Sequence, residues 1–254
     1  MWTTVAEVRR ETANAATLRL DLEGAAFGYR PGQYDTIDPY QFDALAPALR
    51  DRETARGKRE GPGYFSLSSD ATDPRVLEIT VRATSTGAPL PPFLVRDVRP
   101  GQKLSLEGPA GRYFLPAEPP PDVTGILHLC AGSGVAPNRG MIRHALAKGW
   151  PQRHVLVLQE RGEEDVLFRE EWREMLERHG SKLRIRHVYS SKNEYVSPEI
   201  LRDAMSGAIN AADSLAFLCG PNTRRDGRAG FVETWKTGLR DAVGFSPARI
   251  VTEG

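Results

Sequence analysis

Apolar and polar residues alternate along short runs in the first half of the chain. In TLRLDL, VLEITVRAT and KLSLEG every second residue is aliphatic, which is the period of a strand with one buried face. Turn-forming pairs such as Pro31-Gly32, Pro100-Gly101 and Gly108-Pro109 separate these runs. The pattern predicts an N-terminal antiparallel Greek-key β-barrel.

The pattern changes in the second half. Five apolar runs have the pattern of strands, and amphipathic helical patterns lie between them. The runs are GILHLC, HVLVLQ, LRIRHVY, SLAFLC and ARIVTE. This alternation predicts a parallel α/β sheet with helices on both faces. The proline-rich segment LPAEPPPDV is typical of a stiff linker. We therefore expect two domains, a β-barrel over residues 1–117 and an α/β domain over residues 122–254.

Residues 41–63 interrupt the barrel pattern. The front of this segment could form one or two helical turns, and its back, RDRETARGKREGPG, is charged and rich in glycine. We interpret it as a solvated surface insertion, and the alternative is a mobile flap over a site.

Composition narrows the classes of function. A net charge of +1 gives no general reason to expect nucleic acid or a charged membrane as partner. No apolar run approaches the roughly 20 residues that span a bilayer, and the first residues lack the core of a signal peptide. We expect a cytoplasmic protein. Its two cysteines, Cys130 and Cys219, are too few to hold an iron–sulfur cluster with four Cys ligands.

A glycine-containing turn follows the first strand of the second half. AGSGVAP, residues 131–137, stands where a strand gives way to a helix, at the edge of a parallel sheet where ligands bind. Glycine lets a pyrophosphate approach the main-chain amides, and the helix N-terminus favours its charge. A tight turn with no ligand would also use glycines. The spacing departs from Gly-x-Gly-x-x-Gly, because Pro137 holds the last position.

Two further segments strengthen this interpretation. FLCGPN, residues 217–222, ends a later strand with a turn at the same edge of the sheet. In the barrel, GPGYFSLSSD (residues 61–70) combines an aromatic pair with alternating hydroxyls. Such a strand could lay an aromatic face on a planar ring and point hydroxyls at its polar edge, although by itself it is more often an ordinary strand.

Taken in order, these segments resemble the ferredoxin–NADP reductase family of flavoproteins. Its barrel motifs are resembled by RPGQY, YFSLSS and LEGPAGRYF. Its nucleotide-domain motifs are resembled by AGSGVAP, FLCGPN and RIVTEG. The resemblance implies a barrel that binds FAD and a second domain that binds NADP or NAD. It also implies an electron acceptor outside this chain, a ferredoxin or an oxygenase component.

Residue roles follow from the same resemblance. It implies catalytic roles for Ser66, Cys219 and Glu253. The implied flavin contacts are Tyr64, Phe65, Ser66, Leu67, Ser68, Thr80 and Arg82, with Phe65 packing on the flavin ring. The implied nucleotide contacts are Gly132, Ser133, Gly134, Val135, Ala136, Pro137, Arg161, Ser190, Ser191, Lys192, Cys219, Gly220 and Pro221. Ser190, Ser191 and Lys192 would bind a 2′-phosphate, which favours NADPH, although Lys192 also fits a solvated loop lysine.

Two positions depart from the family pattern. Gly63 replaces the arginine that neutralises a flavin phosphate, and Pro91 stands where a serine is expected. Each lost charged hydrogen bond could cost about 1.5–3 kcal/mol. Arg82, or the insertion cations Arg56, Lys58 and Arg59, could replace these contacts.

The leading hypothesis is a flavin-dependent NAD(P)H oxidoreductase that passes electrons to a separate carrier protein or small acceptor. The alternative is a degenerate, non-enzymatic or regulatory member of the family that binds a nucleotide or a protein partner. A plain dehydrogenase without flavin is disfavoured, because a β-rich domain precedes the glycine turn. A nucleic-acid patch in the insertion is disfavoured by the near-neutral charge.

Overall fold

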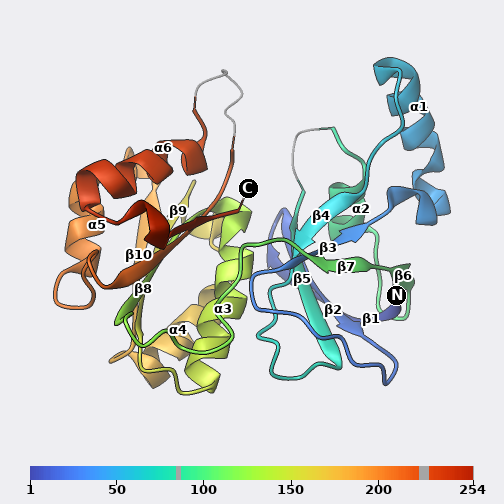
Figure 1. The fold of residues 1–254 in the computed structure, drawn as a ribbon. Coiled ribbons are helices and arrows are strands. Elements are labelled where there is room, and N and C mark those ends of the chain that lie inside the picture. The colour runs from blue at the N-terminus through green and yellow to red at the C-terminus, as the bar shows by residue number, and fades with distance from the viewer. Residues whose placement is uncertain (84–86, 223–228, 254) are drawn as a thin grey trace.

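The computed structural model describes residues 1–83, 87–222 and 229–253. Antiparallel strands make up its N-terminal half, and a parallel sheet covered by helices makes up its C-terminal half (Figure 1). This arrangement confirms the fold class expected from the sequence. Among the described residues, none of the helices combines the length and the apolar character that crossing a bilayer requires.

Two antiparallel sheets build the N-terminal half, with strand orders β5-β2-β1-β6 and β4-β3-β7. A bridge between Leu67 and Ile79 joins them on one side, and on the other side β6 leads directly into β7. The buried side chains of both sheets form one apolar core. The strands are β1 (Trp2–Thr12), β2 (Ala15–Asp21), β3 (Tyr34–Ile37), β4 (Gly63–Ser66), β5 (Val76–Arg82), β6 (Lys103–Ser105) and β7 (Glu107–Ala110).

The insertion is more helical than its sequence indicates. Helix α1 (Ala46–Arg56) has 11 residues and ends at Gly57, whose positive φ of 66° suits glycine. Figure 1 shows α1 projecting from the edge of the barrel. The segment that contains Pro91 forms the helix α2 (Leu90–Arg96), so prolines in its first turn begin a helix.

One buried carboxyl interrupts the barrel core. Asp35 on β3 is fully buried, and neither of its oxygens has a hydrogen-bond partner among the described residues. Its Oδ1 lies 2.0 Å from the position that a Cβ on Gly108 would occupy, so a glycine at this point of β7 makes room for it. Desolvation raises the pKa of Asp35 to about 7, because burial disfavours the charged form.

We expect Asp35→Asn to gain stability relative to the wild type as the pH rises from 4 to 7. Over that range the unfolded Asp35 loses its proton while the folded carboxyl keeps it, so ionisation increasingly favours unfolding. The shift of about three pKa units, from 3.8 to about 7, corresponds to roughly 4 kcal/mol at 1.36 kcal/mol per unit. Urea unfolding of both proteins at pH 4, 6 and 8 measures this. A difference in unfolding free energy that does not change with pH would contradict it.

The C-terminal half contains one parallel sheet of order β10-β9-β8-β11-β12. Helices α5 (Pro198–Met205) and α6 (Phe231–Gly238) pack on one face, and α3 (Val135–Ala147) and α4 (Arg169–His179) pack on the other. The strands are β8 (Gly125–Ala131), β9 (Arg153–Glu160), β10 (Leu183–Tyr189), β11 (Ser214–Cys219) and β12 (Ile250–Thr252). β8 and β11 therefore lie side by side, and both glycine-containing turns leave the sheet at the same edge.

Candidate functional site

A cavity of about 580 Å³ lies where the two halves meet. Strands β4 and β5 and helix α2 line it from the N-terminal half, and the ends of β8, β11 and β12 line it from the C-terminal half. Thirteen of its lining residues were predicted from the sequence: Tyr64, Phe65, Ser66, Thr80, Arg82, Gly132, Ser133, Gly134, Ala136, Cys219, Gly220, Pro221 and Glu253. Of the other three lining residues, Val81 and Ala131 were not predicted as contacts, and Pro91 had been noted only as a departure from the family pattern.

The three residues expected to be catalytic meet in this cavity. Ser66 Oγ donates a hydrogen bond to Glu253 Oε1 at 3.2 Å, and Cys219 Sγ donates one to Glu253 Oε2 at 2.7 Å. One carboxylate therefore connects a barrel strand to the edge of the parallel sheet. Burial, and next the charge of Glu253, raise the pKa of Cys219 well above its ordinary value. The group at this position is a neutral thiol that donates a hydrogen bond.

Glycine is needed at two positions of the turn after β8, and the structural reason differs between them. Gly132 has a φ of +59°, and the nearest atom to a Cβ on it would be Arg82 Nη1 at 3.9 Å. Gly134 has no such φ, but a Cβ on it would lie 2.5 Å from the carbonyl oxygen of Cys219. Gly132 thus allows a left-handed turn beside open space, while Gly134 allows the turn to pack against the end of β11.

A buried polar cluster holds this turn from behind. Asn138 of α3 donates from Nδ2 to the carbonyl of Gly134 at 2.9 Å and lies 2.9 Å from the hydroxyl of Tyr113. Its Oδ1 contacts His128 Nδ1 at 2.8 Å, and His128 Nε2 contacts His154 Nδ1 at 3.1 Å. Burial lowers the pKa of His128 to about 4, so the ring stays neutral. A histidine inside the apolar strand GILHLC was the available signal for this cluster.

Several predicted residues lie outside the cavity lining. Leu67 and Ser68 are fully buried in the barrel, and Ser68 Oγ donates to the carbonyl of Glu78 at 3.2 Å. Val135 and Pro137 are buried in the first turn of α3. These four residues support the site from within the fold.

The predicted 2′-phosphate residues also lie apart from the cavity. Ser190, Ser191 and Lys192 form a short turn after β10, and the amide of Ser191 donates to the carbonyl of Arg161 at 2.8 Å. β10 is two strands from β8, or about 10 Å at the usual strand spacing. An extended ligand could reach from the glycine turn across β9 to this group.

Arg82 connects the two halves. Its guanidinium contacts Glu160 at 3.2 and 3.3 Å and donates to the carbonyl of Asp165 at 2.7 Å. Burial raises the pKa of Glu160 to about 7, and the charge of Arg82 opposes this. The sequence predicted Arg82 as a replacement contact for a flavin phosphate, and the structure already pairs it with a carboxylate.

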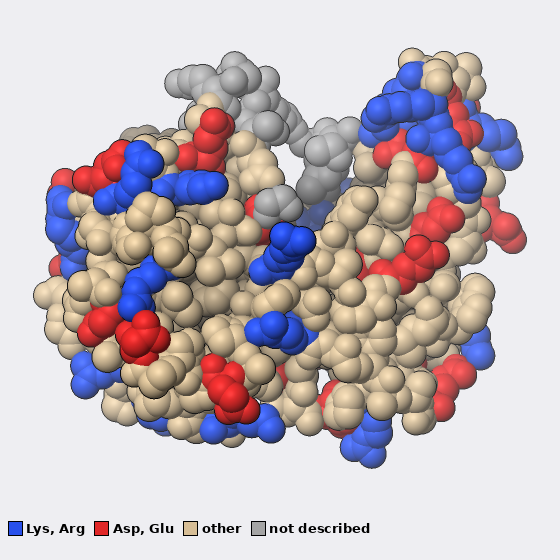
Figure 2. Space-filling model, viewed as in Figure 1, with Lys and Arg blue, Asp and Glu red and all other residues tan. Residues whose placement is uncertain are grey.

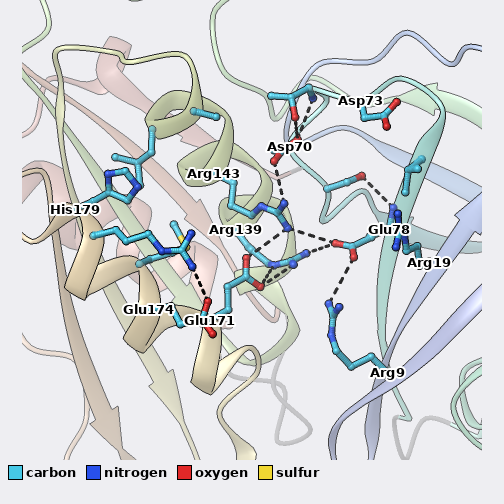
Figure 3. A pocket seen from close by; sticks show the side chains of 17 residues that line it. Arg9, Arg19, Asp70, Asp73, Glu78, Arg139, Arg143, Glu171, Glu174 and His179 are labelled. Atoms are coloured by element: carbon cyan, nitrogen blue, oxygen red, sulfur yellow. Dashed lines mark hydrogen bonds and ion pairs between the residues drawn. The ribbon is translucent and has the colours of Figure 1, made fainter.

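A second cavity, of about 600 Å³, lies farther along α3, toward its C-terminal end. Figure 3 shows Arg139 and Arg143 reaching from α3 toward Glu78 and Asp70 of the N-terminal half and toward Glu171 of α4. Arg139 is 2% exposed and lies 2.6 Å from Glu78. These alternating charges satisfy one another, so the groove is an ion-paired contact between the halves.

Comparison with known proteins shows which proteins this chain resembles. Residues 129–224 match the model of the oxidoreductase NAD-binding domain. Two relatives are ferredoxin reductase components of 3-ketosteroid-9-alpha-monooxygenase. The Rhodococcus rhodochrous protein is 29% identical over 253 residues, covering 98% of this chain and 63% of that protein. The Mycolicibacterium smegmatis protein is 30% identical over 226 residues, covering 85% and 57% respectively.

Over most of its length the chain is similar to ferredoxin reductase components. A solved cytochrome P450 reductase of Amycolatopsis has the same fold, with a TM-score of 0.76 and 22% identity over 99% of this chain and 68% of that one. The reductase-like chain spans 63% and 57% of the length of the two curated relatives.

The barrel accommodates Gly63 through its neighbours. A Cβ at Gly63 would lie 2.7 Å from Phe65 Cε2 and 2.8 Å from Leu90 Cδ2. Phe65 is only 7% exposed and packs in the barrel core, whereas Tyr64 is 66% exposed and meets the Tyr34 ring edge-on at 5.4 Å. Since side chains alternate along a strand, Tyr64 presents an exposed aromatic surface at the cavity, while Phe65, which also lines it, is mostly buried in the barrel core.

Proposed function

We propose that this chain is a flavin-dependent NAD(P)H oxidoreductase that passes electrons from a nicotinamide nucleotide through FAD to a separate carrier protein or small acceptor. The observation that carries this proposal is the cavity in which Glu253 contacts both Ser66 and Cys219. We assign the flavin to a domain of residues 1–117 and the nucleotide to a domain of residues 122–254.

The residues around the cavity fit a flavin ring. Tyr64 offers an exposed aromatic face. Phe65, the residue predicted to pack on the flavin ring, and Ser66 line the same cavity as the glycine turn. A bound flavin accepts a hydride and delivers electrons one or two at a time. Gly132 borders open space, and with Ser133 it would receive the pyrophosphate of the nucleotide.

The polar groups of the chain would orient the two rings. The neutral thiol of Cys219 would face the nicotinamide, and the Ser66 hydroxyl would face the flavin. Glu253 accepts hydrogen bonds from both groups, so it fixes their spacing. A nucleotide bound against this edge of the sheet would exclude water from the reacting atoms.

We propose NADPH as the preferred nucleotide, with Ser190, Ser191 and Lys192 at the 2′-phosphate and Arg161 beside them. Lys192→Glu should raise the KM for NADPH about tenfold, the loss of roughly 1.5 kcal/mol expected for one charged hydrogen bond. The KM for NADH should change less than twofold, because NADH lacks that phosphate. Steady-state kinetics with both nucleotides measures this, and Lys148→Glu, at an exposed lysine after α3, is the control. An equal loss with both nucleotides would contradict the assignment.

We propose that the acceptor is a ferredoxin or an oxygenase component in the cytoplasm. With two cysteines, this chain cannot supply four thiolates to a cluster of its own. The two relatives named as ferredoxin reductase components support this assignment.

The test is the colour of the purified protein. The proposal expects flavin absorbance near 450 nm, bleaching on anaerobic addition of NADPH, and FAD in the denatured supernatant by mass. A protein that stays colourless after incubation with FAD would contradict it. That result would support the degenerate, non-enzymatic alternative, which the substitutions at Gly63 and Pro91 favour.

A further inference from the structure

The barrel lacks a cation at the position where the family binds a flavin phosphate. At Gly63 the ring of Phe65 and a methyl group of Leu90 occupy the space into which a side chain would extend. The other predicted replacement, Arg82, is engaged by Glu160 and by the carbonyl of Asp165. A phosphorylated flavin would need its positive partner from elsewhere in the chain.

The insertion helix places an arginine beside the entrance to α2. Arg52 Nη1 lies 2.9 Å from the position that a Cβ on Gly87 would take. Gly87 has a φ of +79° and precedes, by four residues, the Pro91 that lines the cavity. Arg52 thus lies beside the segment that leads into α2, and the first turn of α2 reaches the cavity through Pro91.

Arg52 is held in place by contacts within the insertion. Its Nε lies 2.5 Å from Glu60 Oε2, which also contacts Arg56 Nη1 at 2.7 Å. The amide of Glu60 donates to the Tyr40 hydroxyl at 3.1 Å. A guanidinium held through one edge loses less side-chain entropy when its other edge binds a ligand.

The other predicted cations of the insertion are placed differently. The Arg59 guanidinium lies over the ring of Tyr40, 4.1 Å from its centroid. Arg56 forms an ion pair with Glu60, and Lys58 is exposed to solvent. Figure 2 shows basic side chains gathered over α1, at the upper right of the molecule. The local excess of positive charge would attract an anion toward Arg52.

We propose that Arg52 binds the phosphate of the flavin beside Gly87, and that the insertion replaces the missing arginine at position 63. This inference rests on the proposed flavin site. It makes the insertion part of the cofactor site, and it makes Arg52 the residue that distinguishes phosphorylated flavins from riboflavin.

The experiment compares flavins that differ in phosphate. Flavin-free protein is titrated with riboflavin, FMN and FAD, and binding is followed by quenching of flavin fluorescence at low and high salt. The variants are Arg52→Gln, which keeps most of the aliphatic stem, and Arg50→Gln, at an exposed arginine of the same helix. Circular dichroism melting of each protein reports whether the fold is retained.

We expect Arg52→Gln to weaken FMN and FAD at least tenfold, to leave riboflavin within twofold, and to remove most of the salt dependence. Arg50→Gln should behave as the wild type. Unchanged FAD affinity in Arg52→Gln would overturn the inference, as would an equal loss for all three flavins. A wild-type protein that binds none of the three would instead overturn the flavin proposal itself.

Discussion

Gly134→Val should raise the KM for NAD(P)H at least tenfold while leaving flavin content unchanged. The new Cβ would lie 2.5 Å from the carbonyl oxygen and 2.9 Å from Sγ of Cys219. To relieve this overlap, the backbone of the turn or of the end of β11 must move, and both line the cavity. A displacement of about 1 Å can cost about a hundredfold in rate. Stopped-flow reduction over a range of nucleotide concentrations separates binding from hydride transfer.

Gly28→Val is the matched control for this variant, because a Cβ on Gly28 meets no atom within 4 Å. Overpacking at Gly134 should also lower stability by about 1–3 kcal/mol, so kinetics are measured well below the melting temperature. Unchanged nucleotide kinetics in folded Gly134→Val would remove the proposed nucleotide site from this turn.

Cys219→Ala should slow flavin reduction by NAD(P)H at least tenfold and leave flavin content unchanged. The substitution removes the donor to Glu253 Oε2 and leaves the carboxylate with Ser66 Oγ as its remaining side-chain partner among the described contacts. Misplacing a group beside reacting atoms is costly in rate. Single-turnover reduction under anaerobic conditions measures the step directly.

Cys130 provides the control within the same sheet. It is the register partner of Cys219 on β8 and is fully buried, but it does not line the cavity. Cys130→Ala should therefore lower stability without a selective effect on reduction. Equal reduction rates in Cys219→Ala and the wild type would show that Cys219 is core packing.

The barrel strands and the parallel sheet were predictable because their signals are local. Alternation in β2 and β5 follows from the one face of each strand that meets the barrel core, although Thr17, Glu78 and Thr80 on their other faces are also buried. The continuous apolar runs of β8 and β9 follow from burial on two faces. The length of α1 was underestimated, because its mostly polar sequence buries only Leu49 and so carries little apolar periodicity.

The candidate site was predictable as a set of segments, but the contacts within it were not. The sequence indicated the turns at Gly132 and Gly220. It did not indicate that Gly134 packs on Cys219 or that Asn138 contacts His128, since each pair joins side chains or backbone from different elements. The alternation that buries Phe65 and exposes Tyr64 depends on which face of β4 meets the core, and a four-residue strand leaves that choice open.

The sequence by itself determined the class of this protein, an antiparallel barrel followed by a parallel sheet with glycine turns at one edge. It could do so because hydrophobic periodicity and turn-forming residues depend on only a few consecutive positions. Only the tertiary structure decided that Glu253 contacts both Ser66 and Cys219, that Arg82 is paired with Glu160, and that Arg52 lies beside Gly87. Those contacts join segments that are distant in the sequence. Because hydrogen bonds and ion pairs act over short distances, such residues become partners only when the folded chain brings them together.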